Sequence, residues 1–347
     1  MDTRGSKKMK ERYENLDGIR AFAAIGIILM HVLANGGFVV SGFMFEKLIP
    51  SFTNLTYFFM LLSAFSMCCG YYEKFRNNTI SLEQFYKRRY ERIWPFFALL
   101  CTLELIVEHN MNALYEWFAD LTLAFGLLPN AAISVVGVGW FIGIVFVFYM
   151  IFPFFTYLIG NKRRAWLVMA ITIVMNVLCK VYFFDETHVV ADYSARSNFL
   201  FSSIFFVAGG LIYLYREKIK TVASKYRWLF IVAALACLVF YYLVNSSEYT
   251  MLILFTLFTF LGISGGGTAK KLFQNKPVRF LSSVSMEIYL CHMFVYRAIE
   301  KMGLLHVTGN EIMNYAAVSI ATVTGAVIMA VVIKKVIALV EKRLQRT

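Results

Sequence analysis

Long apolar runs, separated by short polar stretches, follow one another along the whole chain. A membrane-spanning helix needs about 20 predominantly apolar residues, within a range of about 17–25. Ten runs meet or approach this length, and they cover roughly residues 18–40, 52–72, 93–109, 135–159, 165–184, 197–215, 227–244, 249–265, 279–298 and 313–333. The pattern predicts an all-α polytopic membrane protein, a bundle of about ten transmembrane helices.

The polar stretches between these runs are too short for a soluble domain. We therefore expect residues 1–347 to form one transmembrane domain, with a basic leader over about 1–16 and a tail over about 334–347. Further apolar runs follow the first, which favours a first transmembrane helix over a cleaved signal peptide. The connection 109–134 is apolar enough to form an interfacial or re-entrant helix.

Positive charge is concentrated on one side of the predicted bundle. The leader, the 73–92 segment and the other loops of that side hold 28 Lys and Arg residues, whereas the opposite loops hold only Lys47, Arg196 and Lys301. Cytoplasmic loops carry the excess of Lys and Arg. Both termini are therefore predicted to be cytoplasmic, in the plasma membrane of a bacterium.

Composition agrees with a membrane protein and excludes a soluble one. Hydrophobic residues make up 59% of the chain, charged residues 16%, and the mean hydropathy is +0.64. The net charge of +13 follows from the basic loops, so we expect membrane lipids and no nucleic acid as partners. The six cysteines lie in or beside apolar runs without zinc-site spacing, so buried thiols and no metal are expected.

The first apolar run carries two ionisable residues, Arg20 near its start and His31 deep within it. At 100° per residue the eleven steps between them make three turns plus about 20°, which puts both on nearly one face of a helix, about 16 Å apart along its axis. Ionisable groups in a span usually face the protein interior or a wet cavity. The alternatives are that Arg20 snorkels to lipid headgroups and that His31 bonds a neighbouring carbonyl.

A second histidine, His292, lies in the run 279–298, which crosses in the same direction as the first run. We expect His31 and His292 at comparable depth in the outer half of the bundle, where they line a polar cavity or bond to one another. Asp17 precedes Arg20 by three residues, the spacing at which two side chains on a helix can pair.

A basic segment, LEQFYKRRYERIWPFF, leads into the third run. Its Arg88, Arg89 and Arg92 lie within about one helical turn on the predicted cytoplasmic side. Such arginines often only fix topology or contact anionic lipid. The alternative is a phosphate clamp, because a guanidinium can bind phosphate through two parallel hydrogen bonds.

Four stretches, in order along the chain, resemble the acyltransferase-3 family of integral-membrane acyltransferases. NLDGIRAFAAIGIILMHV is similar to the family's opening, where a histidine follows an arginine after ten intervening residues. The matching residues are Arg20 and His31; Arg89, Arg92, Ile93 and Pro95; Trp140, Tyr149 and Pro153; and Ser285, Tyr289, Leu290 and His292. Two positions depart from the pattern: Val145 replaces a glutamate found in many members, and Ser63-Ala64 replaces Ser-Gly. The first departure puts any glutamate-dependent step in doubt.

The resemblance implies transfer of an acyl group, most often acetyl from acetyl-CoA, to a hydroxyl of a cell-surface or lipid-linked carbohydrate. We therefore expect acetyl-CoA as donor and a carbohydrate acceptor, and we leave the oligomeric state open, a homodimer included. Because acetyl-CoA is cytoplasmic and polyanionic, its nucleotide is expected at Arg88, Arg89 and Arg92, and its thioester would pass Arg20 toward His31.

His31 is the candidate catalytic residue. It would act as general base on the acceptor hydroxyl or as a covalent acetyl carrier, and the sequence does not separate the two. The residues expected to support the chemistry or contact substrate are Asp17, Trp140, Tyr149, Tyr289 and His292.

Two other classes of protein stay open on the sequence. A glycan flippase or exporter would use the intramembrane histidines as a proton relay, and a membrane scaffold would need no chemistry. The sequence shows no clear internal repeat, which weighs against a repeat-built transporter.

Overall fold

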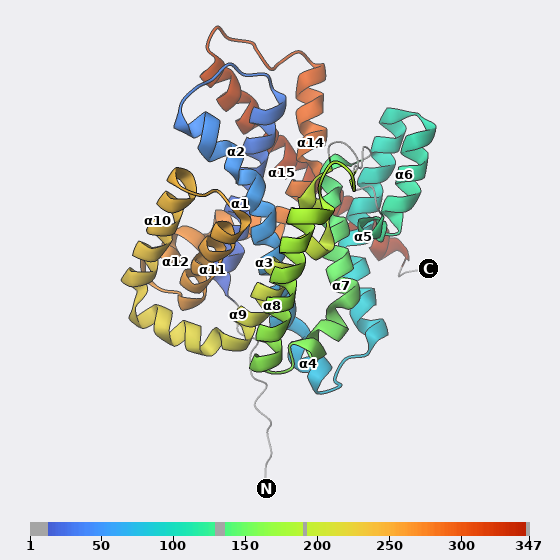
Figure 1. Cartoon of the computed structure of the whole chain (residues 1–347). Coiled ribbons are helices and arrows are strands. Elements are labelled where there is room, and N and C mark those ends of the chain that lie inside the picture. The colour runs from blue at the N-terminus through green and yellow to red at the C-terminus, as the bar shows by residue number, and fades with distance from the viewer. Residues whose placement is uncertain (1–12, 129–135, 190–192, 345–347) are drawn as a thin grey trace.

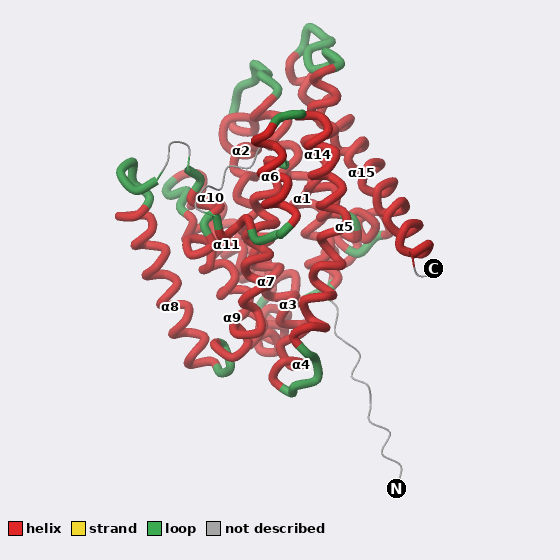
Figure 2. Tube along the Cα trace, turned by 90° about the vertical axis from the view of Figure 1, so that its right-hand side faces the viewer, coloured by secondary structure: helices red, strands yellow, loops and turns green. Residues whose placement is uncertain are grey.

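A computed structural model describes residues 13–128, 136–189 and 193–344, and these residues form helices and no strand. Figure 1 shows a helical bundle with α4 at one end, and with α2 and the connection between α14 and α15 at the other. Turned by 90°, the molecule carries α8 and α15 on opposite flanks (Figure 2). The predicted fold class, an all-helical membrane protein, is confirmed.

The main helices follow the apolar runs closely. The helices of the first half are α1 (Glu14–Asn35), α2 (Ile49–Ser51), α3 (Leu55–Met67), α4 (Glu73–Arg76), α5 (Leu82–Glu108), α6 (Met111–Leu121) and α7 (Trp140–Leu158). Those of the second half are α8 (Lys162–Leu178), α9 (Phe199–Lys225), α10 (Arg227–Leu243), α11 (Glu248–Ser264), α12 (Gly267–Phe273), α13 (Lys276–Ser283), α14 (Ser285–Lys301) and α15 (Glu311–Leu344).

Short 3₁₀ or π turns extend or join these helices. They are η1 (Met44–Leu48), η2 (Phe52–Asn54), η3 (Cys68–Tyr72), η4 (Phe125–Leu127), η5 (Gly137–Gly139), η6 (Cys179–Phe183) and η7 (Ala195–Ser197).

Six helical segments of the described chain are long and apolar enough to cross a membrane, which makes this a multi-pass membrane protein. They are Glu14–Asn35, Met44–Arg76, Gly137–Leu158, Lys162–Phe183, Phe199–Lys225 and Glu311–Arg343. The α13–α14 pair, bent by 73°, would make a seventh. The other predicted spans fall short on length or polarity: α10 and α11 have 17 residues each, and α5 begins with a polar half.

Small residues let the central helices approach one another closely, as is common in membrane bundles. A Cβ on Gly209 of α9 would lie 2.3 Å from the Leu61 carbonyl oxygen of α3. A Cβ on Gly18 of α1 would lie 2.4 Å from the Phe273 carbonyl oxygen of α12. These contacts bring α9 close to α3 and α12 close to α1.

The connection 109–134 folds into α6 and η4, and its residues 129–134 lie outside the described part of the chain. The helix α6 packs antiparallel along α5. Trp117 Nε1 donates to Thr102 Oγ1 at 3.1 Å, and Trp94 Nε1 donates to the Leu121 carbonyl at 2.9 Å. The helix expected in this stretch is therefore present.

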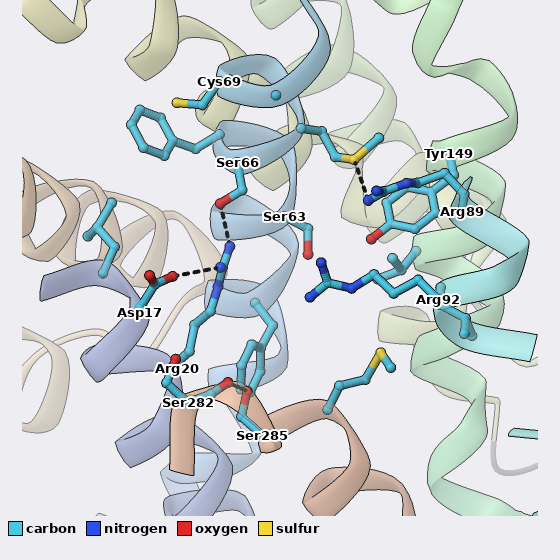
Figure 3. A pocket seen from close by; sticks show the side chains of 18 of the residues that line it. Asp17, Arg20, Ser63, Ser66, Cys69, Arg89, Arg92, Tyr149, Ser282 and Ser285 are labelled. Carbon is cyan, nitrogen blue, oxygen red and sulfur yellow. Dashed lines mark hydrogen bonds and ion pairs between the residues drawn. The ribbon is translucent and has the colours of Figure 1, made fainter. Parts of the chain in front are cut away.

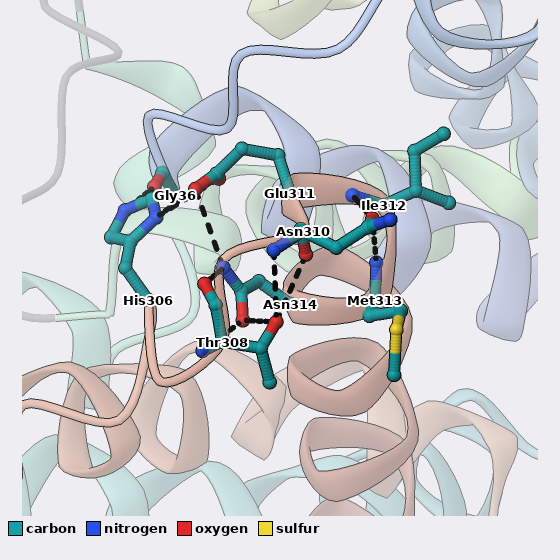
Figure 4. Close-up of polar contacts among 8 residues, drawn as sticks. All are labelled: Gly36, His306, Thr308, Asn310, Glu311, Ile312, Met313 and Asn314. Atoms are coloured by element: carbon teal, nitrogen blue, oxygen red, sulfur yellow. Dashed lines mark hydrogen bonds and ion pairs between the residues drawn. The ribbon is translucent and has the colours of Figure 1, made fainter.

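The end of α1 beyond His31 is tied to the connection between α14 and α15 (Figure 4). His306 Nε2 lies 3.0 Å from the Gly36 carbonyl oxygen, and its Nδ1 lies 3.0 Å from a Glu311 carboxylate oxygen. Asn314 bonds Thr308 in the same connection. This network holds the ends of α1 and α14 together, and with them the segments that carry the two intramembrane histidines.

Candidate active site

A cavity of about 480 Å³ lies between α1, α3, α5, α7 and the bend between α13 and α14 (Figure 3). Three arginines line it: Arg20 from α1, and Arg89 and Arg92 from α5. Asp17 is the one acidic residue in the described wall. The cavity is therefore net positive and suited to an anion.

Arg20 is held in place by α1 and α3 together. Its guanidinium lies 3.5 Å from the Asp17 carboxylate, the expected i,i+3 pair, and donates to the Leu62 carbonyl at 2.7 Å and to Ser66 Oγ at 2.5 Å. Contacts on two helices orient the cation at one end of the cavity (Figure 3). The snorkelling alternative for Arg20 does not fit this geometry, because the guanidinium bonds protein.

Arg89 is positioned by two tyrosines. Its Nη2 donates to Tyr71 Oη at 2.8 Å, and its guanidinium lies 4.9 Å from the Tyr71 ring centre and 5.8 Å from that of Tyr149. Its buried Nε has no hydrogen-bond partner among the described residues. Arg89 thus has a donor still to satisfy inside the cavity wall.

Arg92 reaches from α5 toward Ser63 of α3 (Figure 3) and makes no hydrogen bond or ion pair with another described residue. Arg88 does not line the cavity and is exposed. One residue along a helix turns the side chain by about 100°, so Arg88 projects from another face than Arg89 and Arg92. Of the three arginines predicted to form a phosphate clamp, only Arg89 and Arg92 line the cavity, together with Arg20 from α1.

Hydroxyl groups complete the wall around the arginines. The contributing serines are Ser63, Ser66, Ser282, Ser283 and Ser285. Three of them stand at the bend between α13 and α14, where Ser285 Oγ donates to the Ser282 carbonyl at 3.0 Å. Val145, at the position where many relatives of this pattern have glutamate, also lines the cavity.

Three aromatic rings that line the cavity contact one another: Phe59, Phe141 and Tyr289. The Tyr289 ring centre lies 5.4 Å from that of Phe141 and 6.4 Å from that of Phe59, and the two phenylalanine rings are 6.0 Å apart. Tyr289 Oη donates to the Val138 carbonyl at 2.9 Å, which fixes the ring. We call these three residues the aromatic wall.

The two histidines do not line the cavity, and one of them, His292, contacts Tyr289 of the aromatic wall. Their ring centres are 5.2 Å apart, and the His292 ring lies 5.9 Å from that of Tyr289. His292 is fully buried, and its Nδ1 donates to the Tyr289 carbonyl at 2.6 Å. Because Nδ1 carries this proton, the neutral ring keeps a lone pair on Nε2, and Nε2 has no partner among the described residues.

His31 makes no side-chain hydrogen bond with a described residue, so the alternative of a histidine satisfying a neighbouring carbonyl applies to His292 rather than to His31. Its ring is only partly buried. An imidazole with both nitrogens uncommitted is free to exchange a proton with a substrate.

Arg196 is a residue near the histidines that the sequence pattern did not select. Its guanidinium bonds the carbonyl and the hydroxyl of Thr53, and lies 5.9 Å from the Trp140 ring centre. Its only signal in the sequence was its rarity, as one of three cations in the loops opposite the termini.

The chain matches the family described as "Acyltransferase domain" over residues 13–331. It is also similar to the O-acetyltransferase OatA of Staphylococcus aureus, with 28% identity over 185 residues in strains NCTC 8325 / PS 47, COL and MRSA252 alike. That alignment covers 44% of this chain, and the chain spans only 27% of the length of these curated relatives. No solved structure matches the chain.

Proposed function

Since this chain belongs to the acyltransferase-3 family, whose match extends over residues 13–331, we propose that it moves an acetyl group from acetyl-CoA to a hydroxyl of a cell-surface or lipid-linked carbohydrate. The observation that carries the proposal is a net positive cavity whose aromatic wall contacts a pair of histidines. The similarity to a protein named as an O-acetyltransferase supports acetyl as the group transferred and oxygen as its acceptor. Nothing in these comparisons supports the flippase alternative.

The phosphates of acetyl-CoA would bind the arginines of the cavity. Arg92 makes no hydrogen bond or ion pair with a described residue, and the Nε of Arg89 has no hydrogen-bond partner among them, so both can form charged hydrogen bonds with an anion. Arg20, held in place by Ser66 and Asp17, would bind the anion from the side of the cavity opposite Arg89 and Arg92. The slim pantetheine arm would then extend along α3 toward the aromatic wall.

His31 would act as the general base. It would take the proton of the acceptor hydroxyl while that oxygen attacks the thioester carbonyl. The C–S bond then breaks to release CoA as thiolate, which takes the proton from the His31 imidazolium and leaves His31 neutral again. The lone pair on His292 Nε2 can accept an N–H of His31 and so orient the ring, since the ring centres are 5.2 Å apart. An acetyl-histidine intermediate on His31 is the variant of this scheme that keeps the same residues.

The fixed cation Arg196 suits the negative charge that develops on the carbonyl oxygen during attack. No carboxylate among the described residues lies within ion-pair distance of Arg196, and Thr53 and Trp140 hold its guanidinium in place. A preorganised charge of this kind stabilises an oxyanion without further rearrangement.

We further propose that the chain crosses the cell membrane ten times, with both termini in the cytoplasm. The distribution of 28 basic residues against three supports this orientation. The short apolar helices α10 and α11 and the second half of α5 would supply the spans beyond those that length alone identifies. Reporter fusions test the layout: a fusion after Thr347 should read as cytoplasmic, and fusions near Tyr193 or Leu305 as external.

The reaction itself is tested with purified protein in lipid vesicles. Acetyl-CoA labelled in the acetyl group should lose its label to a carbohydrate fraction in the presence of the protein. The proposed activity would be refuted if the carbohydrate fraction stayed unlabelled and if free CoA were released no faster than in empty vesicles.

A further inference from the structure

A second cavity, of about 440 Å³, lies between the turn that carries α2 and η2 and the C-terminal end of α10. In Figure 1, α2 lies at the end of the bundle opposite α4. This cavity therefore opens on the face from which, in the proposed function, the acceptor must arrive. We call it the outer cavity, and its volume falls within the range of about 300–1,000 Å³ that is usual for ligand sites.

The wall of the outer cavity is made of hydroxyl, amide and phenol groups. Ser51 Oγ lies 2.6 Å from Tyr242 Oη, and Asn54 Nδ2 donates to Tyr241 Oη at 3.1 Å. Tyr241 is buried and Tyr242 half-buried, with the Phe43 ring 5.2 Å from that of Tyr242. The inner wall is thus a preorganised set of aromatic faces with polar edges.

The mouth of the outer cavity carries polar side chains that are exposed. They are Lys47, Asn245 and Ser246, and none of the three side chains forms a hydrogen bond or ion pair with another described residue. These donors and acceptors are available to a ligand. Lys47 is the one charged residue in the described lining, so the site does not need an anionic ligand.

The outer cavity and the histidine pair share one structural segment. Asn54 of the cavity wall and Thr53, which bonds Arg196, are neighbours in η2. This turn packs against α1 at Gly26, where a Cβ would lie 2.8 Å from Leu55 Cδ1 and 3.4 Å from Phe52 Cδ2. Gly26 stands five residues before His31 on the same helix, so η2 packs on α1 about 7.5 Å along the axis from the proposed base.

We propose that the outer cavity binds one sugar unit of the acceptor carbohydrate and so presents a neighbouring hydroxyl to His31. A sugar ring has apolar C–H faces and a rim of hydroxyl groups. Aromatic rings with amide and hydroxyl donors around them match both parts of such a ligand. The inference rests on the proposed function, since it names the site at which the acceptor of that reaction is held.

The test uses a cysteine at the mouth of the cavity. Ser246→Cys is introduced into the full chain, membrane vesicles containing the endogenous acceptor are prepared, and the outer face is treated with a bulky, membrane-impermeant maleimide. Label transfer from acetyl-CoA to membrane carbohydrate is measured before and after treatment. We expect treatment to lower this transfer by at least about tenfold, which corresponds to a loss of about 1.4 kcal/mol in the free energy of acceptor binding. Acetyl-CoA binding should stay unchanged.

The matched control is Asn112→Cys on α6, an exposed polar position away from the outer cavity. The unsubstituted chain treated in the same way controls for its own six cysteines. If treated Ser246→Cys transfers label as well as treated Asn112→Cys, the outer cavity is not the acceptor site. If the untreated, unsubstituted chain transfers no label to carbohydrate, the proposed function itself fails, which is a different result.

Discussion

Arg20 and His31 share one face of α1, yet their surroundings differ in every respect that matters for binding. Arg20 borders a cavity of about 480 Å³, beside two further arginines, and bonds three groups of its own chain. The His31 side chain makes no hydrogen bond with a described residue, and His31 does not line that cavity. The aromatic wall lines that cavity and contacts, through Tyr289, the His292 ring that lies beside His31.

The site therefore has two halves: an arginine half around Arg20, Arg89 and Arg92, and a histidine half around His31 and His292. The arginine half is already formed and can accept an anion without rearrangement. Under the proposed function, the thioester would have to pass the aromatic wall to reach His31, so the histidine half would be complete only once these rings move. Such an arrangement would keep water from the thioester until the acceptor has bound.

The largest effect on the rate of acetyl transfer is expected from a substitution in the histidine half. His31→Ala should lower the rate of acetyl transfer by about 10²–10⁴-fold, the usual contribution of a general base. Acetyl-CoA binding should stay at the level of the unsubstituted protein, because His31 lies outside the cavity. Transfer kinetics and donor binding, measured on one detergent preparation, check both statements. Transfer close to that of the unsubstituted chain would remove His31 from the mechanism.

How far the sequence alone leads depends on which half is considered. The stripe of Arg20 and His31 follows from helix periodicity, and the alignment of His31 with His292 follows from depth along two helices of like direction. The exclusion of Arg88 also follows from periodicity, once the face of α5 that packs inward is known. That face is set by tertiary contacts, which the sequence pattern does not contain.

Other parts of the site depend on contacts between distant segments. Ser66 and the Leu62 carbonyl meet Arg20 only because α3 packs beside α1, and Tyr71 meets Arg89 through the η3 turn. Arg196 reaches Trp140 from a loop 56 positions later in the chain. None of these partners has a spacing along the chain that would predict the contact.

The second prediction concerns the arginine half. Arg89→Ala and Arg92→Ala should each weaken acetyl-CoA binding by about 10- to 100-fold, because a hydrogen bond to a charged group contributes about 1.5–3 kcal/mol. Arg→Lys at either position should restore only part of the affinity, since an ammonium cannot form the bidentate contact. Equilibrium binding of acetyl-CoA in detergent measures the effect.

The matched control is the pair Arg163 and Arg164, which lies in another basic loop and does not line the cavity. Alanine at these two positions should leave acetyl-CoA affinity unchanged. Equal losses in both sets of variants would mean that the arginines of α5 act through general surface charge, and the contrast between the two halves would lose its basis.

The third prediction tests the aromatic wall directly. Phe59→Ala removes one of the three rings and should let water reach a bound thioester more readily. Hydrolysis of acetyl-CoA without acceptor should rise several-fold, while acetyl-CoA binding changes little. Free CoA release in vesicles lacking carbohydrate measures this leak. An unchanged leak would show that the wall does not keep water from the donor.

The smallest effect is expected from a single hydroxyl of that wall. Tyr289→Phe keeps the ring but loses the bond to the Val138 carbonyl, which lies in the turn before Trp140. A buried hydrogen bond contributes about 0.5–1.5 kcal/mol net, so transfer should fall no more than about tenfold, with donor binding unchanged and a slightly lower unfolding temperature. Tyr57→Phe is the control, because the Tyr57 ring stacks on Phe205 and its hydroxyl bonds no described residue. A loss in Tyr289→Phe as large as in His31→Ala would mean that the phenol takes part in the chemistry, and the wall would then belong to the catalytic half.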